Sequence, residues 1–413
     1  MAGKEKKGIY LDYAASTPVS EAALRAMKPY LSGGFGNTES VHSFGREAEK
    51  AVSEAREAVA KALGLPPASG FREIVFTASA TEANNLALRG VVGSLGSSTS
   101  LGKLNFREAN IVISSIEHSS VYETARALEK EGVEIRLARP DKRGVVSPEA
   151  VRKLLDGNTL LVSVMQGNNE TGAIQPITAI GKAIAEFKVK SPKSKILFHT
   201  DAAQSFMYLA LRPHECGVDL ATLSSHKMHG PKGAAALFVR DGLSAQAGVK
   251  IAPQITGGAQ ERGLRAGTLN VSAIAGFGAA IAEAEKKRAG RAKKVSALRK
   301  YFWEALRKNI KSVGVNGDMK NSLPHILNVH FPTIRAEELV IALDLQGVAV
   351  SAGSACVSRA SSSSRTVREM YGDEERARRS VRVSFGEYTS QKELDCVLLI
   401  LQSIIHRLSP KPR

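Results

Sequence analysis

Short runs of β-branched and aliphatic residues alternate with helical patterns through the middle of the chain. The runs lack the apolar–polar alternation of half-exposed strands, so we expect strands that are buried on both faces. These strands are predicted at residues 73–76, 110–115, 159–165, 195–199, 218–224 and 234–239. Between them, Ser119 to Lys130 has a helical pattern ended by Gly132, and Ser147 with Pro148 predicts a helix start. This succession predicts an α/β fold with a mostly parallel sheet.

A second pattern begins near residue 286 and predicts a smaller α+β domain. A long amphipathic helix comes first, because apolar residues recur at steps of three and four. They are Val295, Leu298, Phe302, Leu306 and Ile310. A strand near residues 326–329, another at 381–385 and a terminal helix follow. The predicted domains are therefore residues 17–285 (large) and residues 1–16 with 286–413 (small).

Length and composition fit a two-domain enzyme, since the chain has 413 residues and 43% hydrophobic content. The net charge of +17 raises nucleic acid as a partner. Much of this charge is local: residues 286–311 hold eleven lysines or arginines and one acid, Glu304. We interpret them as the solvated face of the amphipathic helix. No zinc-finger spacing or aromatic series accompanies them, so we do not expect nucleic acid to be the partner.

The three cysteines, Cys216, Cys356 and Cys396, form no disulfide framework, because they are odd in number and widely spaced. The sequence has no C-x-x-C pair, which would predict a metal site. Cys396 begins an apolar stretch that is too short to span a membrane, and it is expected to be a buried thiol. The first ten residues lack an apolar leader segment. We expect a cytoplasmic protein.

Polar clusters directly follow the predicted strands, where ligands of open α/β sheets bind. They are SATE (79–82), EHSS (117–120), GNNETG (167–172), DAAQ (201–204) and SSHKMHGPKG (224–233). Asp201 ends one strand and Lys227 follows the next. A lysine that forms a Schiff base and an acid beside the pyridine nitrogen are what pyridoxal phosphate (PLP) requires. Taken singly, Asp201 is typical of a helix cap and Lys227 of a surface residue.

A series of segments, in order from Ile9 to Leu408, resembles the fold-type I cysteine desulfurases of the NifS/IscS kind. The segments are IYLDYAASTP, FGNTESVHSFG, IVFTASATEANNLAL, IEHSSV, NNETG, HTDAAQS, SSHKMHGPKG, GGAQERGLRAGT and SAGSAC. The resemblance implies a fold-type I PLP-dependent transferase, whose large domain has a mostly parallel seven-stranded sheet. Such an enzyme converts L-cysteine to L-alanine and holds the sulfur as a persulfide. It also implies a set of cofactor-binding residues: Ala80, Thr81, His118, Asn169, Asp201, Gln204, Ser224, His226, Lys227 and Thr268.

Within this set, the resemblance implies that Lys227 carries the cofactor and that Asp201 pairs with the pyridine nitrogen. Gln204 would donate to the phenolic oxygen, and His118 would stack on the ring as an acid or base. The phosphate would bind at the helix start formed by Ala80 and Thr81, where free N–H groups favour an anion.

The resemblance further implies that Arg382 clamps the substrate carboxylate with help from Asn37 and Asn169. Thr268 would reach the phosphate bound by a second subunit, which implies a homodimer. Cys356 lies in the run of small residues from Ser351 to Ser364 and would be the thiolate that attacks sulfur. The sulfur would pass to an acceptor or iron–sulfur scaffold protein, for example in [2Fe–2S] cluster assembly or thio-cofactor synthesis. The identity of the acceptor stays open.

Three alternatives remain at this point. Aminotransferase chemistry is the least expected, because it gives no reason for a cysteine in a run of small residues. A selenocysteine lyase would share PLP and several of the same motifs, but would not require Cys356 as a nucleophile. A nucleic-acid-binding protein with a degenerate PLP fold would explain the basic helix, but the intact set of Lys227, Asp201 and His118 argues against it.

Overall fold

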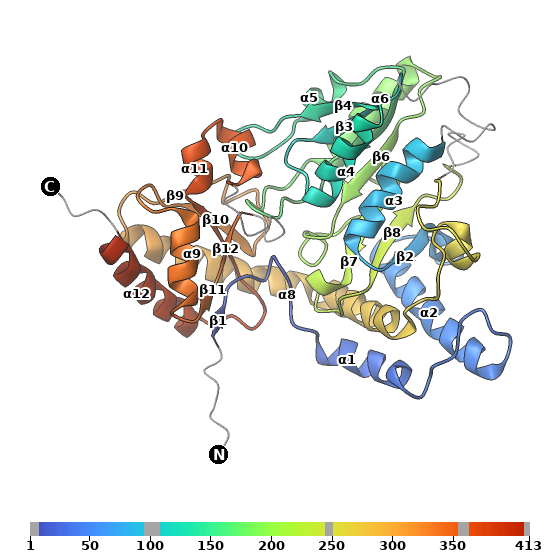
Figure 1. Ribbon diagram of the computed structural model, residues 1–413, viewed down its shortest axis with the longest axis horizontal. Helices are drawn as coiled ribbons and strands as arrows, with labels where there is room; N and C mark the ends of the chain where they lie inside the picture. The colour runs from blue at the N-terminus through green and yellow to red at the C-terminus, as the bar shows by residue number, and fades with distance from the viewer. Residues whose placement is uncertain (1–7, 95–107, 244–250, 354–362, 409–413) are drawn as a thin grey trace.

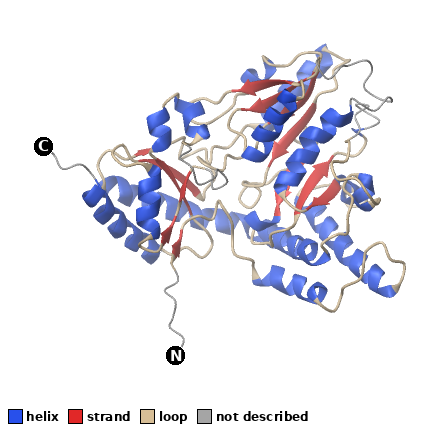
Figure 2. Cartoon of the chain, in the orientation of Figure 1, coloured by secondary structure: helices blue, strands red, loops and turns tan. Residues whose placement is uncertain are grey.

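The computed structural model describes residues 8–94, 108–243, 251–353 and 363–408, whose elements form two groups bridged by one long helix (Figure 1). The larger group contains a seven-stranded sheet covered by helices on both faces, and the smaller contains a four-stranded sheet (Figure 2). Among these residues, no helix is both long and apolar enough to cross a membrane.

The large sheet has the strand order β2-β8-β7-β6-β5-β3-β4. The strands are β2 (Ile74–Thr77), β3 (Asn110–Ser114), β4 (Glu134–Ala138), β5 (Thr159–Ser163), β6 (Leu197–Asp201), β7 (Leu220–Ser224) and β8 (Ala235–Val239). Only β8 runs against its neighbours, β2 and β7, and the remaining pairs are parallel. The carboxyl ends of β2, β3, β5, β6 and β7 therefore meet at one edge. The mostly parallel seven-stranded sheet is confirmed.

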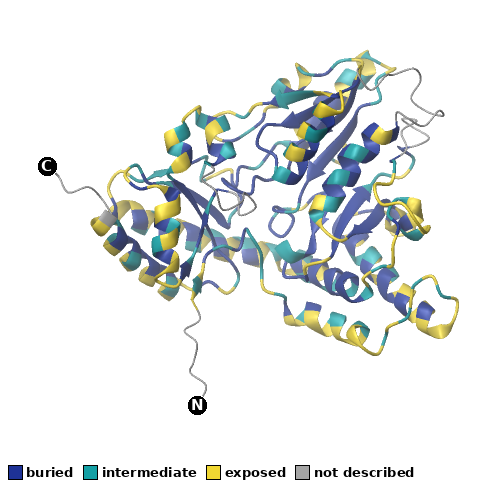
Figure 3. Cartoon of the chain, in the orientation of Figure 1, coloured by how far each residue is buried: buried dark blue, intermediate teal, exposed yellow. Residues whose placement is uncertain are grey.

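Helices cover this sheet on both sides, which is why its inner strands are largely apolar. The helices of the large group are α1 (Glu21–Met27), α2 (Ser43–Ala62), α3 (Ala80–Gly93), α4 (Ser119–Lys130), α5 (Pro148–Arg152) and α6 (Ile177–Lys190). Its short 3-10 turns are η1 (Lys28–Leu31), η2 (Gly70–Glu73), η4 (Ser225–Lys227) and η5 (Gln260–Gly263). Alternate residues of one strand belong to different cores: Phe76 packs in one and Val75 in the other. Figure 3 shows the buried sheet between these layers. The predicted start at Ser147 is confirmed, because its side chain caps α5.

The helix α8 (Val271–Asn309) is far longer than the predicted basic helix and runs from one group of elements to the other (Figure 1). Its first half packs on the large sheet through Phe277, whose ring lies 6.3 Å from that of Phe76. Its second half packs in the small group through Phe302, whose ring lies 5.8 Å from that of Phe385. The predicted apolar positions 295, 302, 306 and 310 are all buried.

The small group is built around a sheet of order β12-β13-β10-β9. Its elements are β9 (Gly314–Val315), β10 (Ile326–His330), α9 (Ala336–Asp344), β11 (Val348–Ala349), β12 (Ser351–Ala352), α10 (Arg365–Tyr371), α11 (Glu374–Arg378), β13 (Ser380–Ser384) and α12 (Gln391–Leu408). The N-terminal strand β1 (Ile9–Tyr10) pairs with β11 in parallel. The segment after β1 then crosses to the large sheet, so two stretches of chain connect the groups.

Three expectations need correction. Cys396 is exposed on α12, because its side chain falls on the outer face of that helix. The basic face of α8 is not wholly solvated: Arg291 bonds to Glu387 and Arg299 to the carbonyl oxygen of Leu323, and both are only 5% exposed. The edge strand β4 was not predicted, because most of its residues are only partly buried and its sequence, EIRLA, is mixed.

Candidate active site

A cavity of about 170 Å³ lies at the carboxyl edge of the large sheet. Ten of the predicted site residues line it: Ala80, Thr81, His118, Asn169, Asp201, Gln204, Ser224, His226, Lys227 and Arg382. Nine of them lie at or just after the carboxyl ends of five strands that run in the same direction, and Arg382 comes from β13 of the small sheet. The topology of the sheet explains this convergence.

Asp201 lies at the end of β6 and is 5% exposed. Its Oδ2 accepts a hydrogen bond from Asn84 Nδ2 at 2.8 Å, and its Oδ1 accepts from the backbone N–H of Ala203 at 2.9 Å. Asn84 Nδ2 also lies 2.7 Å from Ser120 Oγ. These partners hold the carboxylate in one orientation toward the cavity that it lines.

His118 caps the start of α4, and its Nδ1 accepts from the backbone N–H of Ser120 at 3.1 Å. The ring proton is therefore on Nε2. Burial lowers the pKa of His118, and Lys227 acts in the same direction while Asp201 opposes them. The imidazole is neutral at physiological pH and carries one N–H.

Lys227 follows β7 in the short turn η4. Its Nζ donates to the carbonyl oxygens of Ala14 and Ala15, at 2.5 and 2.9 Å. Those carbonyls belong to the segment that crosses from β1 to the large sheet. These two carbonyl oxygens hold the amine at the cavity wall.

The start of α3 forms another wall of the cavity. Ser79 caps this 14-residue helix by accepting from Glu82 N, and Ala80 and Thr81 are its first residues. The first N–H groups of a helix have no carbonyl partners within it, so they favour an anion. Ser224 and His226 line the same cavity, and burial, reinforced by Lys227, lowers the pKa of His226 to about 4. A neutral imidazole can accept or donate there without adding charge.

Arg382 is 1% exposed and spans the two groups of elements. Its Nη1 donates to the carbonyl oxygen of Asn169 at 2.9 Å, and its Nη2 donates to Asp12 Oδ1 at 2.7 Å. Its Nε has no partner among the described residues, although it is buried. A buried charged donor of this kind is a ready site for an anionic group.

The residues around the cavity fit PLP. A lysine amine, a fixed carboxylate and a helix start with free N–H groups face one space, as this cofactor requires. The side-chain oxygen of Gln204 is also buried without a partner among the described residues. A bound group would satisfy such atoms.

Cys356 lies outside the described residues, but both flanking segments are described. A cavity of about 370 Å³ is lined by Gly353, Ser364, His118 and Asn169 among others. Glu170 fixes one flank: its Oε2 accepts from Ser364 Oγ at 2.5 Å and its Oε1 accepts from Thr366 Oγ1 at 3.1 Å. The described residues on either side of Cys356, Gly353 and Ser364, therefore line one cavity with His118 and Asn169.

Two predicted residues do not line the cavity. Asn37 is exposed, and its Oδ1 accepts from the backbone N–H of Glu39 within its own loop. Thr268 is also exposed. The structure of one chain does not bring either of them to the other site residues.

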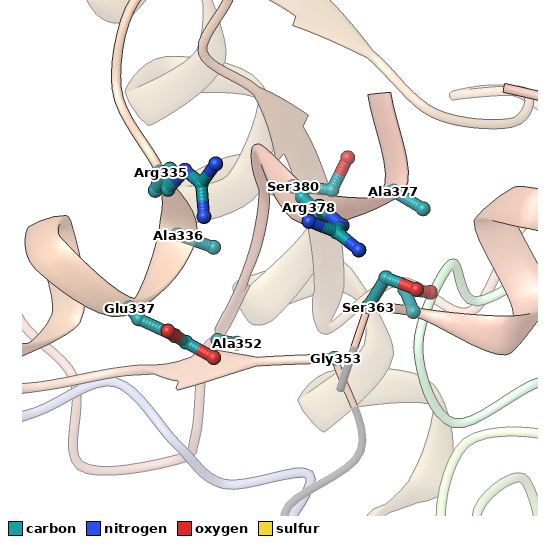
Figure 4. Close-up of a pocket in the computed structure, with 10 residues that line it drawn as sticks. Arg335, Ala336, Glu337, Ala352, Gly353, Ser363, Ala377, Arg378 and Ser380 are labelled. Atoms are coloured by element: carbon teal, nitrogen blue, oxygen red, sulfur yellow. The ribbon is translucent and has the colours of Figure 1, made fainter. Parts of the chain in front are cut away.

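A separate hollow of about 40 Å³ lies in the small group of elements (Figure 4). Its walls include Arg335 and Glu337 at the start of α9, and Arg378 from α11. None of the predicted site residues lines it.

Three site residues were not assigned from the sequence although each lies in a quoted motif. Asn84 and Ser120 connect Asp201 with His118, and Asp12 binds Arg382. In the sequence, Asn84 and Ser120 have the appearance of ordinary helix residues. The one available signal for Asp12 was that Arg382, in a predicted strand, would need an acid nearby to offset its charge.

The chain is similar to known proteins over almost its whole length. The profile of the aminotransferase class-V family matches residues 9–397. A protein named cysteine desulfurase IscS, from Dictyoglomus turgidum, is 40% identical over 98% of this chain and 96% of its own length. Another protein of that name, from Serratia proteamaculans, is 38% identical over 98% of this chain and 94% of its own length.

Solved structures give the same result. A NifS-like protein superposes with a TM-score of 0.85 at 33% identity, covering 97% of this chain and all of its own. The structure titled SspA in complex with cysteine has a TM-score of 0.75 at 33% identity, and the match covers 92% of this chain and 100% of that one.

Proposed function

The chain belongs to the class-V aminotransferase family and is a PLP-dependent cysteine desulfurase, and we propose from this premise how its own residues serve the reaction. The observation that carries the proposal is that Lys227, Asp201 and His118 line one cavity, although they follow three different strands. Relatives are named as desulfurases, and none of the comparisons favours selenocysteine lyase.

In the proposed arrangement, Lys227 binds the cofactor covalently, Asp201 faces its ring nitrogen, and the start of α3 with Ser224 and His226 holds its phosphate. Asn84 and Ala203 N keep the Asp201 carboxylate oriented. When bound, PLP supplies an electron sink next to the substrate Cα.

L-Cysteine is proposed to bind with its carboxylate at Arg382. The guanidinium has one buried donor, Nε, without a protein partner among the described residues, while Asp12 and the Asn169 carbonyl fix the other two nitrogens. One neighbouring structure is titled as a complex with cysteine, which supports this substrate. Asn37 remains a predicted contributor.

Proton transfer is assigned to Lys227, and His118 is proposed to assist as a hydrogen-bond donor. The neutral ring of His118 carries its N–H on Nε2, because Nδ1 accepts from Ser120 N–H, and it can donate a hydrogen bond from Nε2. The Lys227 amine can take and return a proton while the carbonyls of Ala14 and Ala15 hold it nearby.

Cys356 is proposed as the residue that receives the sulfur. It lies three residues after Gly353, and three residues of extended chain span about 10 Å. Its thiolate would form an S–S bond with the substrate sulfur while the substrate Cβ–S bond breaks. The electron pair goes to the substrate carbon, which takes up a proton and leaves as L-alanine, and Cys356 retains a persulfide.

A homodimer is the proposed assembly, with Thr268 reaching the phosphate site of the second subunit. Large apolar side chains are exposed on the segment between η1 and α2: Phe35 is 75% and Val41 89% exposed, and a second copy would cover them. The sulfur acceptor is proposed to be a separate protein such as an iron–sulfur scaffold, and the proposed location is the cytoplasm. We also propose residues 17–285 and residues 1–16 with 286–413 as the two domains.

The experiment that tests the cofactor assignment is direct. The purified protein should be yellow, and borohydride should attach the reduced cofactor to the peptide that contains Lys227. An adduct on another lysine would overturn the assignment. Lys232 supplies the control, because it lies nearby in sequence and Lys232→Ala should leave the adduct in place.

A further inference from the structure

His325 is a buried histidine that contacts Gln204 from the opposite group of elements. It immediately precedes β10, it is 1% exposed, and its Nε2 lies 2.9 Å from Gln204 Nε2. Its ring stacks on Tyr208, with 4.2 Å between ring centres and 20° between planes. The ring of His325 therefore has a fixed position beside Gln204, the residue that is proposed to contact the cofactor.

The imidazole of His325 is neutral. Burial lowers its pKa well below the ordinary value, and the cations Arg299, Arg382 and Lys227 act in the same direction. A neutral imidazole has one N–H and one acceptor nitrogen. Which nitrogen carries the proton therefore decides what Gln204 can do.

Two arrangements of this pair are possible, because the O and N atoms of an amide are nearly equal in shape. If Gln204 Nε2 donates to His325 Nε2, the proton is on Nδ1. Neither His325 Nδ1 nor Gln204 Oε1 then has a partner among the described residues. A buried N–H without a partner is costly.

If the amide is turned over, His325 Nε2–H donates to Gln204 Oε1. The histidine then has only an acceptor nitrogen unpaired, which costs less than an unpaired N–H group. The amide NH₂ of Gln204 takes the place of the unpartnered oxygen and needs an acceptor. Gln204 lines the ligand cavity, so a bound anionic oxygen would supply one.

We propose that His325 is a positioning residue, whose Nε2–H holds Gln204 Oε1 so that the Gln204 NH₂ donates to the phenolic oxygen of PLP. The proposal rests on the proposed place of Gln204 beside that oxygen. Tyr208 contributes by holding the imidazole plane, and His325 itself does not touch the cofactor.

A donor at the phenolic oxygen stabilises the deprotonated, more negative form of the cofactor chromophore and so lowers its pKa. Loss of His325 should free the Gln204 amide to rotate and weaken that donor. The pKa should therefore rise, and the visible absorbance of the holoenzyme reports it directly in a pH titration. This readout does not depend on turnover.

The test compares four holoenzyme variants with wild type by their absorbance midpoints. Gln204→Met removes the donor and should raise the midpoint by about one to two pH units. His325→Phe keeps a ring against Tyr208 but has no N–H on that ring, so it should also raise the midpoint. His325→Gln places an N–H near the Nε2 position and should restore the wild-type midpoint.

The double variant Gln204→Met/His325→Phe decides whether His325 acts through Gln204. It should show no rise beyond that of Gln204→Met alone. A normal midpoint in His325→Phe, or an additive double variant, would overturn the proposal. A normal midpoint in Gln204→Met would instead remove the assigned role of Gln204. If His325→Phe does not fold, His325→Asn, whose amide is too short to replace Nε2, should show the same rise.

Discussion

Arg382 donates from Nη2 to Asp12 Oδ1 at 2.7 Å, although 370 residues separate the two in the sequence. Asp12 lies in the segment that crosses from β1 to the large sheet, and Arg382 lies on β13. The carboxylate offsets the charge of a guanidinium that is almost fully buried. One acid therefore holds the proposed substrate clamp in place.

Asp12→Ala should raise the KM for L-cysteine by about tenfold or more, because it leaves a buried guanidinium N–H unpaired and free to turn. Asp12→Asn keeps an acceptor oxygen at the same position and should raise KM less. Steady-state kinetics on both variants, with circular dichroism to confirm folding, would check this. A folded Asp12→Ala protein with the wild-type KM would show that Arg382 does not need this partner.

Cys356→Ser should bind PLP and L-cysteine but release almost no alanine, since a hydroxyl is a far poorer nucleophile toward sulfur. Mass spectrometry of wild type after brief exposure to L-cysteine should find one extra sulfur on the peptide with Cys356, removable by a thiol. Cys396→Ser is the matched control, because that thiol is exposed on α12. Wild-type alanine production by Cys356→Ser would favour the selenocysteine lyase mechanism.

A mixture of Lys227→Ala chains and Thr268→Ala chains should be more active than either variant alone. If each site takes Lys227 from one chain and Thr268 from the other, a mixed dimer contains one intact site. Refolding the two together and assaying alanine would measure the gain. An active monomer in light scattering would contradict the shared site.

Glu117 should make stability fall as pH rises. Burial, reinforced by Asp201, raises its pKa well above 4.5, although Met165 N donates to Oε1. The folded protein keeps this proton at a pH where the unfolded chain has lost it, so the free energy of unfolding decreases from about pH 4.5 up to the raised pKa.

Glu117→Gln should remove this contribution, which amounts to at most about 1.4 kcal/mol per pH unit. Urea unfolding at several pH values should show the variant gaining stability relative to wild type as the pH increases. Glu123→Gln, on the exposed face of α4, should show no such trend. Parallel pH profiles for wild type and Glu117→Gln would mean that Glu117 is ionised in the folded state.

Two glycines of α8 should respond oppositely to alanine. A Cβ at Gly290 meets no atom within 4 Å, so Gly290→Ala should stabilise the fold by about 0.5–1 kcal/mol. A Cβ at Gly278 would lie 2.7 Å from Ala55 Cα, so Gly278→Ala should destabilise it by about 1–3 kcal/mol. Thermal unfolding measures both. Equal melting temperatures would contradict the packing of α8 on α2.

The strands of the large sheet could be predicted because both of their faces are buried, which leaves unbroken apolar runs. The order of the strands in the sheet could not be deduced from the sequence. The polar clusters at their carboxyl ends could be recognised, and residues of these clusters line the cavity. The edge strand β4 escaped notice because water reaches part of it, so Glu134 and Arg136 interrupt its apolar pattern. The motif resemblance, rather than any periodicity, supplied Arg382 and Gln204.

Residues that act through others were the hardest to predict. Asn84 and His325 touch no ligand in the proposed site. Each acts on a site residue that is far away in the sequence: Asn84 bonds to Asp201, and His325 contacts Gln204. Cys396 was misplaced for a different reason: it sits in an apolar run, but the helix turns it outward from Val397 and Leu398, which are buried. An apolar neighbourhood along the chain does not fix the direction of a side chain.

The helix α8 sets the angle between the two walls of the active site. From Glu285 to Gly290 none of its residues is buried, while Ala284 packs on one side and Arg291 on the other. Insertion of a single residue in that stretch would rotate one half by about 100° relative to the other, while the buried residues of each half lie outside the stretch. Arg382 would turn away from Lys227. The number of residues in this stretch therefore matters to the active site as much as any side chain in the cavity does.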